Sequence, residues 1–325
     1  MVDQWTIDPA ALSWARFDRA LPIAFVDLGR VDADDPFGHH LPPFPIVGLG
    51  DRHHPAGTRL DAVVEHPVTA AALARSVAAH PRAAAVTVQL LRSIEGVPVD
   101  AALTIESLCY GMLQGSEEHH TWRDARKPGT PPPGRIVVAR DAGTLTVLID
   151  RPKTRNAIDR AIRDGLYDAF SVAACDPGIR RTVVRSVGPA FSVGADLDEF
   201  GTTRDPATAH LIRAETLPAI PLARCAAKVE IHIQGACIGA GLEIAAFARR
   251  VTAAPSAWFQ LPELAMGLIP GAGGCVSIAR RIGRQRTALM ILSGRRIGAA
   301  TALRWGLIDA IEDLPPIDPA TLDDD

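Results

Sequence analysis

The sequence has little lysine, few cysteines and no long apolar run, and each of these shortages excludes a class of protein. Its 325 residues carry 34 basic and 37 acidic side chains, a formal net charge of −3, and lysine occurs only at Lys127, Lys153 and Lys228. This balance leaves no basic surface for a nucleic-acid backbone. No stretch reaches the roughly 18 uninterrupted apolar residues that a membrane span needs. We therefore expect neither a nucleic-acid partner nor a membrane partner.

Cysteine usage excludes a disulfide framework and a structural zinc site. The 5 cysteines are far apart and form no CxxC pair, and no His/Cys/Asp cluster has the spacing of a metal site. The N-terminus is acidic and lacks the basic segment and apolar run of a signal peptide. We expect a reducing, cytoplasmic location and no metal.

What the chain does contain is the composition of an ordinary globular protein, with 47% hydrophobic and 22% charged residues. The segment KPGTPPPG, residues 127–134, breaks it in two, because three consecutive prolines continue neither a helix nor a central strand. We predict an N-terminal domain over residues 1–128 and an α/β core domain over residues 129–325.

The two parts differ in their predicted elements. Residues 22–30 and 43–51 each predict a short strand, and helical patterns cover 68–96, with a break at His80-Pro81, and about 99–126. After the prolines, residues 135–150 predict a hairpin, 155–176 a helix, 181–187 and 229–233 strands, and 242–250 a helix. Strands alternating with helices indicate a layered α/β fold.

Three turns rich in small residues are candidates for chemistry. In GACIGAGLE, residues 235–243, a strand turns into a helix, where unpaired backbone N–H groups can hold a ligand oxygen. In PAFSVGADL, residues 189–197, the N–H of Ala195 could supply a second donor. The third turn, residues 267–274, follows Glu263. Tight packing turns explain each pattern equally simply.

Glu243 and Glu263, which stand beside these turns, are a candidate acid–base pair. Glu263 follows a proline in an otherwise apolar segment, where burial would raise the pKa of its carboxyl group. Two such groups beside an oxyanion-binding turn could act on one water molecule. The simpler alternative for each is a helix cap or a solvated surface residue.

Residues 135–311 resemble the crotonase (enoyl-CoA hydratase/isomerase) superfamily. Five motifs stand in family order: RPKTRNAI, AFSVGADL, GACIGAGLEIA, FQLPELAMGLIPGAGG and SGRRIGAATALRWGLIDAI. The resemblance implies an α/β fold with a ββα spiral core and an acyl-CoA thioester substrate. Coenzyme A would then be part of the substrate, with no separate cofactor, in fatty acid metabolism. It also implies a homotrimer or a hexamer built as a dimer of trimers.

The resemblance assigns roles to the candidate residues. The backbone N–H groups of Ala195 and Ala240 would form the oxyanion hole, although the family usually has glycine where Ala240 stands. Glu243 and Glu263 fill both glutamate positions of hydratases, which implies addition of water across an α,β double bond. Alternatives are an isomerase or acyl-CoA hydrolase of the same fold, or a catalytically idle acyl-CoA-binding or assembly subunit.

Coenzyme A contacts are implied at five further positions. Lys153 and Arg155 match the place where basic side chains meet the phosphates, with a solvated turn as the alternative. Where some members have a phosphate-binding lysine, this chain has Asp198. The complete set that we expect to bind coenzyme A is Lys153, Arg155, Asp196, Arg126 and Lys127.

The chain departs from the family at its ends. It stops soon after GLIDAI, whereas residues 59–128 resemble the helical tail that family members carry after their last strand, and RLDAVVEHP echoes WGLIDAIEDLP. We expect the N-terminal segment to be a degenerate remnant of a preceding copy. Its tail-like helices would replace the usual C-terminal helices on this core or on a neighbouring subunit. An unrelated alanine-rich helical domain is the alternative.

The strand before the oxyanion turn is unusually polar for a buried parallel strand. Glu230, His232 and Gln234 share one face by period-2 spacing. We expect a polar layer against the N-terminal segment; the alternative is an added polar group near the site, with His232 titrating near neutrality.

Overall fold

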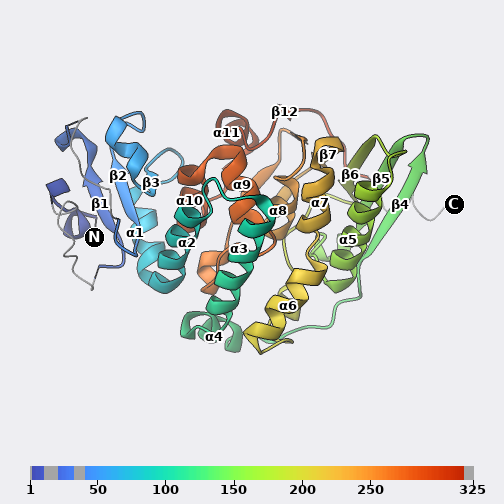
Figure 1. Cartoon of the computed structure of the whole chain (residues 1–325), viewed down its shortest axis with the longest axis horizontal. Coiled ribbons are helices and arrows are strands. Elements are labelled where there is room, and N and C mark those ends of the chain that lie inside the picture. The colour runs from blue at the N-terminus through green and yellow to red at the C-terminus, as the bar shows by residue number, and fades with distance from the viewer. Residues whose placement is uncertain (1, 11–20, 33–40, 318–325) are drawn as a thin grey trace.

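The computed structural model describes residues 2–10, 21–32 and 41–317, and within them three sheets with helices on their faces (Figure 1). The N-terminal sheet consists of three parallel strands, β1 (Ala24–Asp27), β2 (Ile46–Leu49) and β3 (Ala62–Val63). The two short strands expected over residues 22–30 and 43–51 are therefore confirmed. They pair with each other because both carry a buried apolar run.

A six-stranded sheet forms the centre of the second part. Its order is β12-β9-β7-β6-β5-β4, and only the β4–β5 pair is antiparallel. This confirms the predicted hairpin. The strands are β4 (Arg135–Asp141), β5 (Thr144–Asp150), β6 (Arg181–Ser186), β7 (Val229–Ile233), β9 (Arg250–Ala253) and β12 (Ala310–Ile311).

A small third sheet positions two of the candidate turns. It contains β8 (Ala236–Ile238), β10 (Trp258–Gln260) and β11 (Ile297–Gly298), with β8 and β10 parallel. Because the carboxyl ends of parallel neighbours lie at the same edge, the segments after β8 and β10 emerge side by side. They lead into α8 (Ala240–Ala245) and the 3-10 helix η8 (Glu263–Met266).

The core helices are α5 (Arg160–Cys175), α6 (Pro206–Thr216), α7 (Ala219–Cys225), α9 (Gly274–Ile282), α10 (Arg284–Ser293) and α11 (Ala299–Trp305). Two predicted helix boundaries are wrong. α5 begins at Arg160 rather than at 155, because Asp159 caps it by accepting from the Ile162 N–H at 2.9 Å. α8 ends at Ala245, since Arg250 already belongs to β9.

Among the described residues, four α-helices precede the proline-rich segment: α1 (Ala70–Ala79), α2 (Pro81–Ser93), α3 (Val99–Gln114) and α4 (Glu117–Asp124). The break at His80-Pro81 is confirmed. These helices lie on the core of the same chain (Figure 1): α1 and α2 pack on α10, α2 and α3 on α9, α3 on α6, and α4 on η8. The alanine-rich faces allow this close packing.

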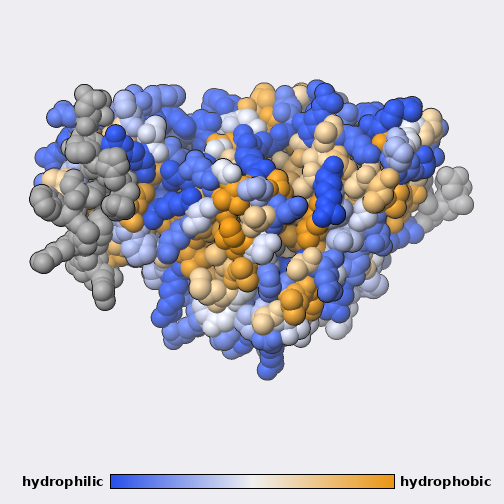
Figure 2. All heavy atoms as spheres, viewed as in Figure 1, coloured by the Kyte–Doolittle hydropathy of each residue, from blue (hydrophilic) through white to orange (hydrophobic). Residues whose placement is uncertain are grey.

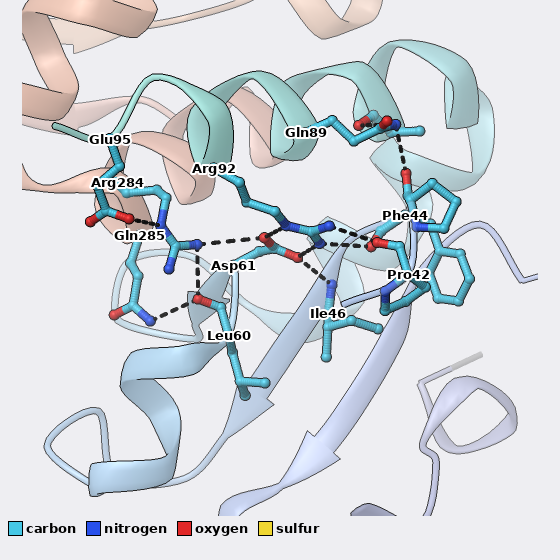
Figure 3. Close-up of polar contacts among 12 residues, drawn as sticks. Pro42, Phe44, Ile46, Leu60, Asp61, Gln89, Arg92, Glu95, Arg284 and Gln285 are labelled. Carbon is cyan, nitrogen blue, oxygen red and sulfur yellow. Dashed lines mark hydrogen bonds and ion pairs between the residues drawn. The ribbon is translucent and has the colours of Figure 1, made fainter. Parts of the chain in front are cut away.

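A buried carboxylate ties the N-terminal sheet to the helices (Figure 3). Asp61, which is 1% exposed, accepts from the Ile46 N–H at 2.9 Å and from Arg92 Nη2 at 2.5 Å. Arg284 of α10 lies 3.5 Å from its other oxygen and also donates to the Leu60 carbonyl. Glu95 pairs with the same guanidinium from a largely exposed position. The carboxylate thus joins the sheet to α2 and α10.

The polar face of β7 finds its partners elsewhere than in the described N-terminal residues, so the expected layer against that segment is wrong there. Glu230 pairs with Arg181 at 2.6 Å, and His232 Nδ1 lies 2.8 Å from Thr252 Oγ1. The Gln234 amide donates to Ser186 on the neighbouring strand. Burial lowers the pKa of His232. The face is polar because the neighbouring strands β6 and β9 supply its partners.

The surface over α3 and α6 carries apolar side chains (Figure 2). Among them, Leu108, Met112 and Leu211 are each more than half exposed. Within the described residues, no helix has the length and apolarity that crossing a bilayer requires. The predicted trimer or hexamer stays a prediction.

Candidate active site

Two of the turns lie against each other. The Ile238 N–H donates to the Ser192 carbonyl at 3.0 Å, and the Ser192 N–H donates to the Ala236 carbonyl at 3.1 Å. Gly194, with φ of 92°, is required at the contact: a Cβ there would lie 3.0 Å from the Ile238 oxygen. These backbone bonds hold the segments 192–195 and 236–240 side by side.

The amides of Ala195 and Ala240 stand at this junction. Both residues line one cavity, and in the described part of the chain neither amide donates a hydrogen bond. Ala240 is the first residue of α8, where a helix leaves its N–H groups unpaired and carries the positive end of its dipole. Two free donors at one site suit an oxygen that gains negative charge. The assignment as an oxyanion hole stays a prediction.

Glu243 lies one turn into α8 and is 2% exposed. Its Oε2 accepts from the Ala272 N–H at 2.6 Å and the Gly274 N–H at 2.8 Å. Burial raises its pKa to about 7, against the opposing effect of these two bonds. A carboxyl group with this pKa can hold or release a proton near neutrality.

Glu263 reaches the same cavity from η8. Its Oε2 is buried and has no hydrogen-bond partner among the described residues. Gly239 makes room for it, because a Cβ at Gly239 would come 2.6 Å from Oε1. Burial, and then the charge of Glu243, raise the pKa of Glu263 well above its usual value. This environment favours a protonated carboxyl group whose buried oxygen is free for a ligand.

A third buried carboxylate, Glu106, was not predicted. It extends from α3, is 1% exposed, and accepts from the Gly273 N–H at 2.7 Å and the Cys275 N–H at 2.8 Å. Burial, and then the charge of Glu243, raise its pKa. Its helical spacing from the buried Leu103 and Leu113 was the available signal that it faces inward.

The cavity measures about 850 Å³. Glu243 and Glu263 line it together with apolar side chains from several elements, among them Phe200, Ile212, Leu217, Ile244, Met266 and Leu268. A largely apolar pocket with a few convergent polar groups is typical of a small-molecule site. The structure therefore brings both predicted glutamates and both predicted N–H donors to one cavity.

Tyr110 and Arg213 also line the cavity and were not predicted. The tyrosine ring packs on the turn of Gly271, where a Cβ would come 2.3 Å from its Cδ2. The Arg213 guanidinium lies over that ring, 4.7 Å from its centroid. Burial raises the pKa of the Tyr110 hydroxyl, so it stays neutral. Neither residue belongs to a motif, which is why sequence reasoning missed them.

The predicted coenzyme A contacts occupy different surroundings. Lys153 and Arg155 are exposed on the turn after β5, outside the cavity lining. Asp196 lines the cavity, but its buried carboxylate pairs with Arg151 at 2.6 Å. Arg126 and Lys127 are exposed after α4. Their roles toward coenzyme A stay predictions.

Arg126 has a specific neighbour in the core. Its Nη2 lies 4.0 Å from Asp198 Oδ1, and its guanidinium lies 5.2 Å from the centre of the Trp122 ring. The N-terminal segment thus places a cation beside the position where some relatives carry lysine. Across the described ranges, no three His, Cys, Asp or Glu side chains are grouped so that they could hold a metal ion.

The fold and the site together define a crotonase-type protein. The sequence pattern of the enoyl-CoA hydratase/isomerase family matches residues 139–314, more than half of the chain. The chain belongs to the enoyl-CoA hydratase/isomerase family.

Individual relatives agree with this assignment. The chain is 33% identical to "Probable enoyl-CoA hydratase 2, mitochondrial" of Arabidopsis thaliana, over 55% of this chain and 62% of that protein. It is 32% identical to 2,3-dehydroadipyl-CoA hydratase of Escherichia coli, over 54% and 68%. The enoyl-CoA hydratase structure from Bacillus anthracis superposes with a TM-score of 0.51 at 25% identity, over 55% of this chain and 70% of that chain. The chain thus spans about two thirds of the length of these relatives.

Proposed function

We propose that this protein is a 2-enoyl-CoA hydratase. The observation that carries the proposal is the pairing of two buried carboxyl groups, Glu243 and Glu263, in one cavity with two unpaired backbone N–H groups. An isomerase can work with one carboxyl group, whereas addition of water needs one group to activate the water and another to protonate carbon. The names of the relatives, which are hydratases, support the same activity.

The chemistry assigns a different task to each carboxyl group. The thioester oxygen would accept from the Ala195 and Ala240 N–H groups, each worth about 3–4 kcal/mol as negative charge develops. Glu243, with a pKa of about 7, would take a proton from water as its oxygen bonds to the β carbon. Glu263, held protonated, would give its proton to the α carbon. The product is a 3-hydroxyacyl-CoA, and exchange with solvent then removes the proton from Glu243 and returns one to Glu263.

Loss of the enoyl thioester ultraviolet absorbance tests this proposal with short, long and aromatic enoyl-CoAs. Glu243→Gln and Glu263→Gln are each expected to remove turnover while the protein stays folded. Glu215→Gln is the matched control, because Glu215 is exposed on α6 and does not line the cavity. Turnover that survives in either cavity variant contradicts the mechanism, and no turnover of any thioester by the wild type contradicts the function.

We also propose that residues 59–128 complete the site within their own chain, in the place of the helices that other members carry at the C-terminus. Three contacts support this: Glu106 holds the turn of Gly273, Tyr110 lines the cavity, and His119 Nδ1 lies 3.0 Å from the Met266 carbonyl. All three come from helices before the proline-rich segment.

Subunit mixing tests that arrangement. Chains carrying Glu106→Gln are co-refolded with chains carrying Glu243→Gln. If each site is built from one chain, every site keeps a defect and activity is not restored. Restoration in the mixture would show that the N-terminal helices act on a neighbouring subunit.

A further inference from the structure

Arg213 is a cation in the wall of the apolar cavity. It extends from α6, is partly buried, and burial lowers the pKa of its guanidinium without neutralising it. Gly111 on α3 gives it room, since a Cβ there would lie 3.3 Å from Arg213 Nη2. The chain therefore places a permanent positive charge in a cavity that Arg160 and Arg163 also line and that apolar side chains largely surround.

In the described ranges, the hydrogen-bond partners of this guanidinium are all uncharged. Nε donates to Ser107 Oγ at 2.9 Å, Nη1 to Gln114 Oε1 at 2.9 Å, and Nη2 to the Ser107 carbonyl at 3.1 Å. A guanidinium has five N–H donors, so one on each terminal nitrogen remains available.

No carboxylate of the described residues forms an ion pair with Arg213. Glu106 is the acid whose charge acts on it, but both Glu106 oxygens are held by the amides of Gly273 and Cys275. A partly buried charge without a counter-ion is unfavourable. The side chains that the structure describes therefore leave this cation without a directly paired carboxylate.

Arg213 stands where two cavities meet. A second cavity of about 250 Å³ lies beyond it, and Arg213 and Leu217 line both. Tyr110 lies between the arginine and the turn of Gly271, and its ring stacks against the guanidinium. Ser107 and Gln114 fix the guanidinium from the other side, so little freedom is lost when a ligand binds.

We propose that Arg213 selects acyl thioesters whose acyl chain ends in a carboxylate, which its two remaining N–H groups bind where the two cavities meet. This inference rests on the proposed function, since it takes the ligand to be an acyl-CoA. The carboxylate supplies the missing counter-ion, and a guanidinium binds it in a planar, two-bond geometry that a methyl group cannot replace. Without Arg213 the same carboxylate would meet a largely apolar wall that carries the buried Glu243 and Glu263.

Equilibrium binding of saturated acyl-CoAs tests the proposal without requiring turnover. Succinyl-, adipyl- and suberyl-CoA are each titrated by calorimetry against the methyl-ended chain of equal length, butanoyl-, hexanoyl- or octanoyl-CoA. We expect at one length a Kd about tenfold to a hundredfold lower for the carboxylate. Arg213→Gln should abolish or invert this preference, measured as the ratio of the two Kd values in a pair. Methyl-ended chains should still bind the variant, which shows that it is folded. Arg213→Lys should retain part of the ratio.

Arg224→Gln is the matched control, because Arg224 is exposed on α7 and lines only the second cavity; its ratio should equal that of the wild type. Equal Kd values within every pair, an unchanged ratio in Arg213→Gln, or equally tight binding of the adipyl-CoA methyl ester each overturn this inference alone. If no acyl-CoA binds the wild type, the proposed function falls together with it.

Discussion

Glu106 and Glu243 share four consecutive backbone amides. The N–H groups of Ala272 and Gly274 donate to Glu243, and those of Gly273 and Cys275 donate to Glu106, at 2.6 to 2.8 Å. These amides lead into α9, whose first turn carries the positive end of the helix dipole. One carboxylate comes from each part of the chain, so Glu243 is positioned by a turn that the N-terminal segment holds in place.

Glu106→Gln is expected to loosen this turn. The side-chain amide offers one acceptor and places an NH2 group against the other N–H, which leaves a buried donor unpaired at a cost of about 1–3 kcal/mol. The charge of Glu106 also raises the pKa of Glu263. The substitution should therefore lower the pKa of Glu263. If activity needs protonated Glu263, the activity of Glu106→Gln should fall at a lower pH than that of the wild type.

A pH–rate profile and thermal unfolding measure both effects. Glu117→Gln is the control, because its side chain is 79% exposed on α4. If the activity of Glu106→Gln falls at the same pH as that of the wild type on the alkaline side of the profile, Glu106 acts on stability alone.

The raised pKa of Glu243 makes stability depend on pH. The folded state holds the proton of Glu243 more tightly than the unfolded chain does. The stabilisation that this proton provides is therefore complete below pH 4.5 and is lost as pH rises through about 7. The loss amounts to about 3 kcal/mol of unfolding free energy. Glu243→Gln should thus gain stability relative to the wild type between pH 5 and 8, as urea unfolding can measure. A difference that is constant with pH would show that Glu243 is ionised throughout.

Gly239→Ala should impair catalysis more than folding. The added Cβ would meet Glu263 Oε1 at 2.6 Å, and φ of 47° is unfavourable for alanine. Displacement of Glu263 and of the adjoining Ala240 N–H should lower kcat by about 10²–10³-fold. Gly298→Ala is the control, since no atom lies within 4 Å of a Cβ there. Similar kcat values for the two variants would show that the approach of Glu263 to Gly239 has no catalytic role.

Asp61→Asn should detach the N-terminal sheet from the helices. Removing the charge of Asp61 leaves Arg92 without its carboxylate and Arg284 with the exposed Glu95 alone, at a cost of about 3–5 kcal/mol. Glu95→Gln touches the same Arg284 guanidinium, but Glu95 is 68% exposed, so its loss should cost about 1 kcal/mol or less. Equal changes in the denaturation midpoint for the two variants would contradict the anchoring role of Asp61.

The sequence predicts the local features of this site and not its long-range ones. The glycine turns, Glu243 and Glu263 stand in motifs because backbone geometry and a short spacing define them. Glu106 meets amides 167 and 169 positions further along the chain, and no local pattern encodes that approach. Arg213 could not be predicted either, because an arginine on an amphipathic helix usually indicates the solvated face of that helix. The partners of the polar β7 face were predicted wrongly for the same reason, because they come from neighbouring strands.

Isotope incorporation from labelled water tests the central claim most directly. Enoyl-CoA is incubated with the protein in D2O containing H2¹⁸O, and the product is analysed by mass spectrometry and NMR. We predict a 3-hydroxyacyl-CoA with ¹⁸O on the β carbon and one deuterium on the α carbon. Deuterium without ¹⁸O would indicate an isomerase, and ¹⁸O in a released carboxylate would indicate a hydrolase; either result would contradict the hydratase mechanism.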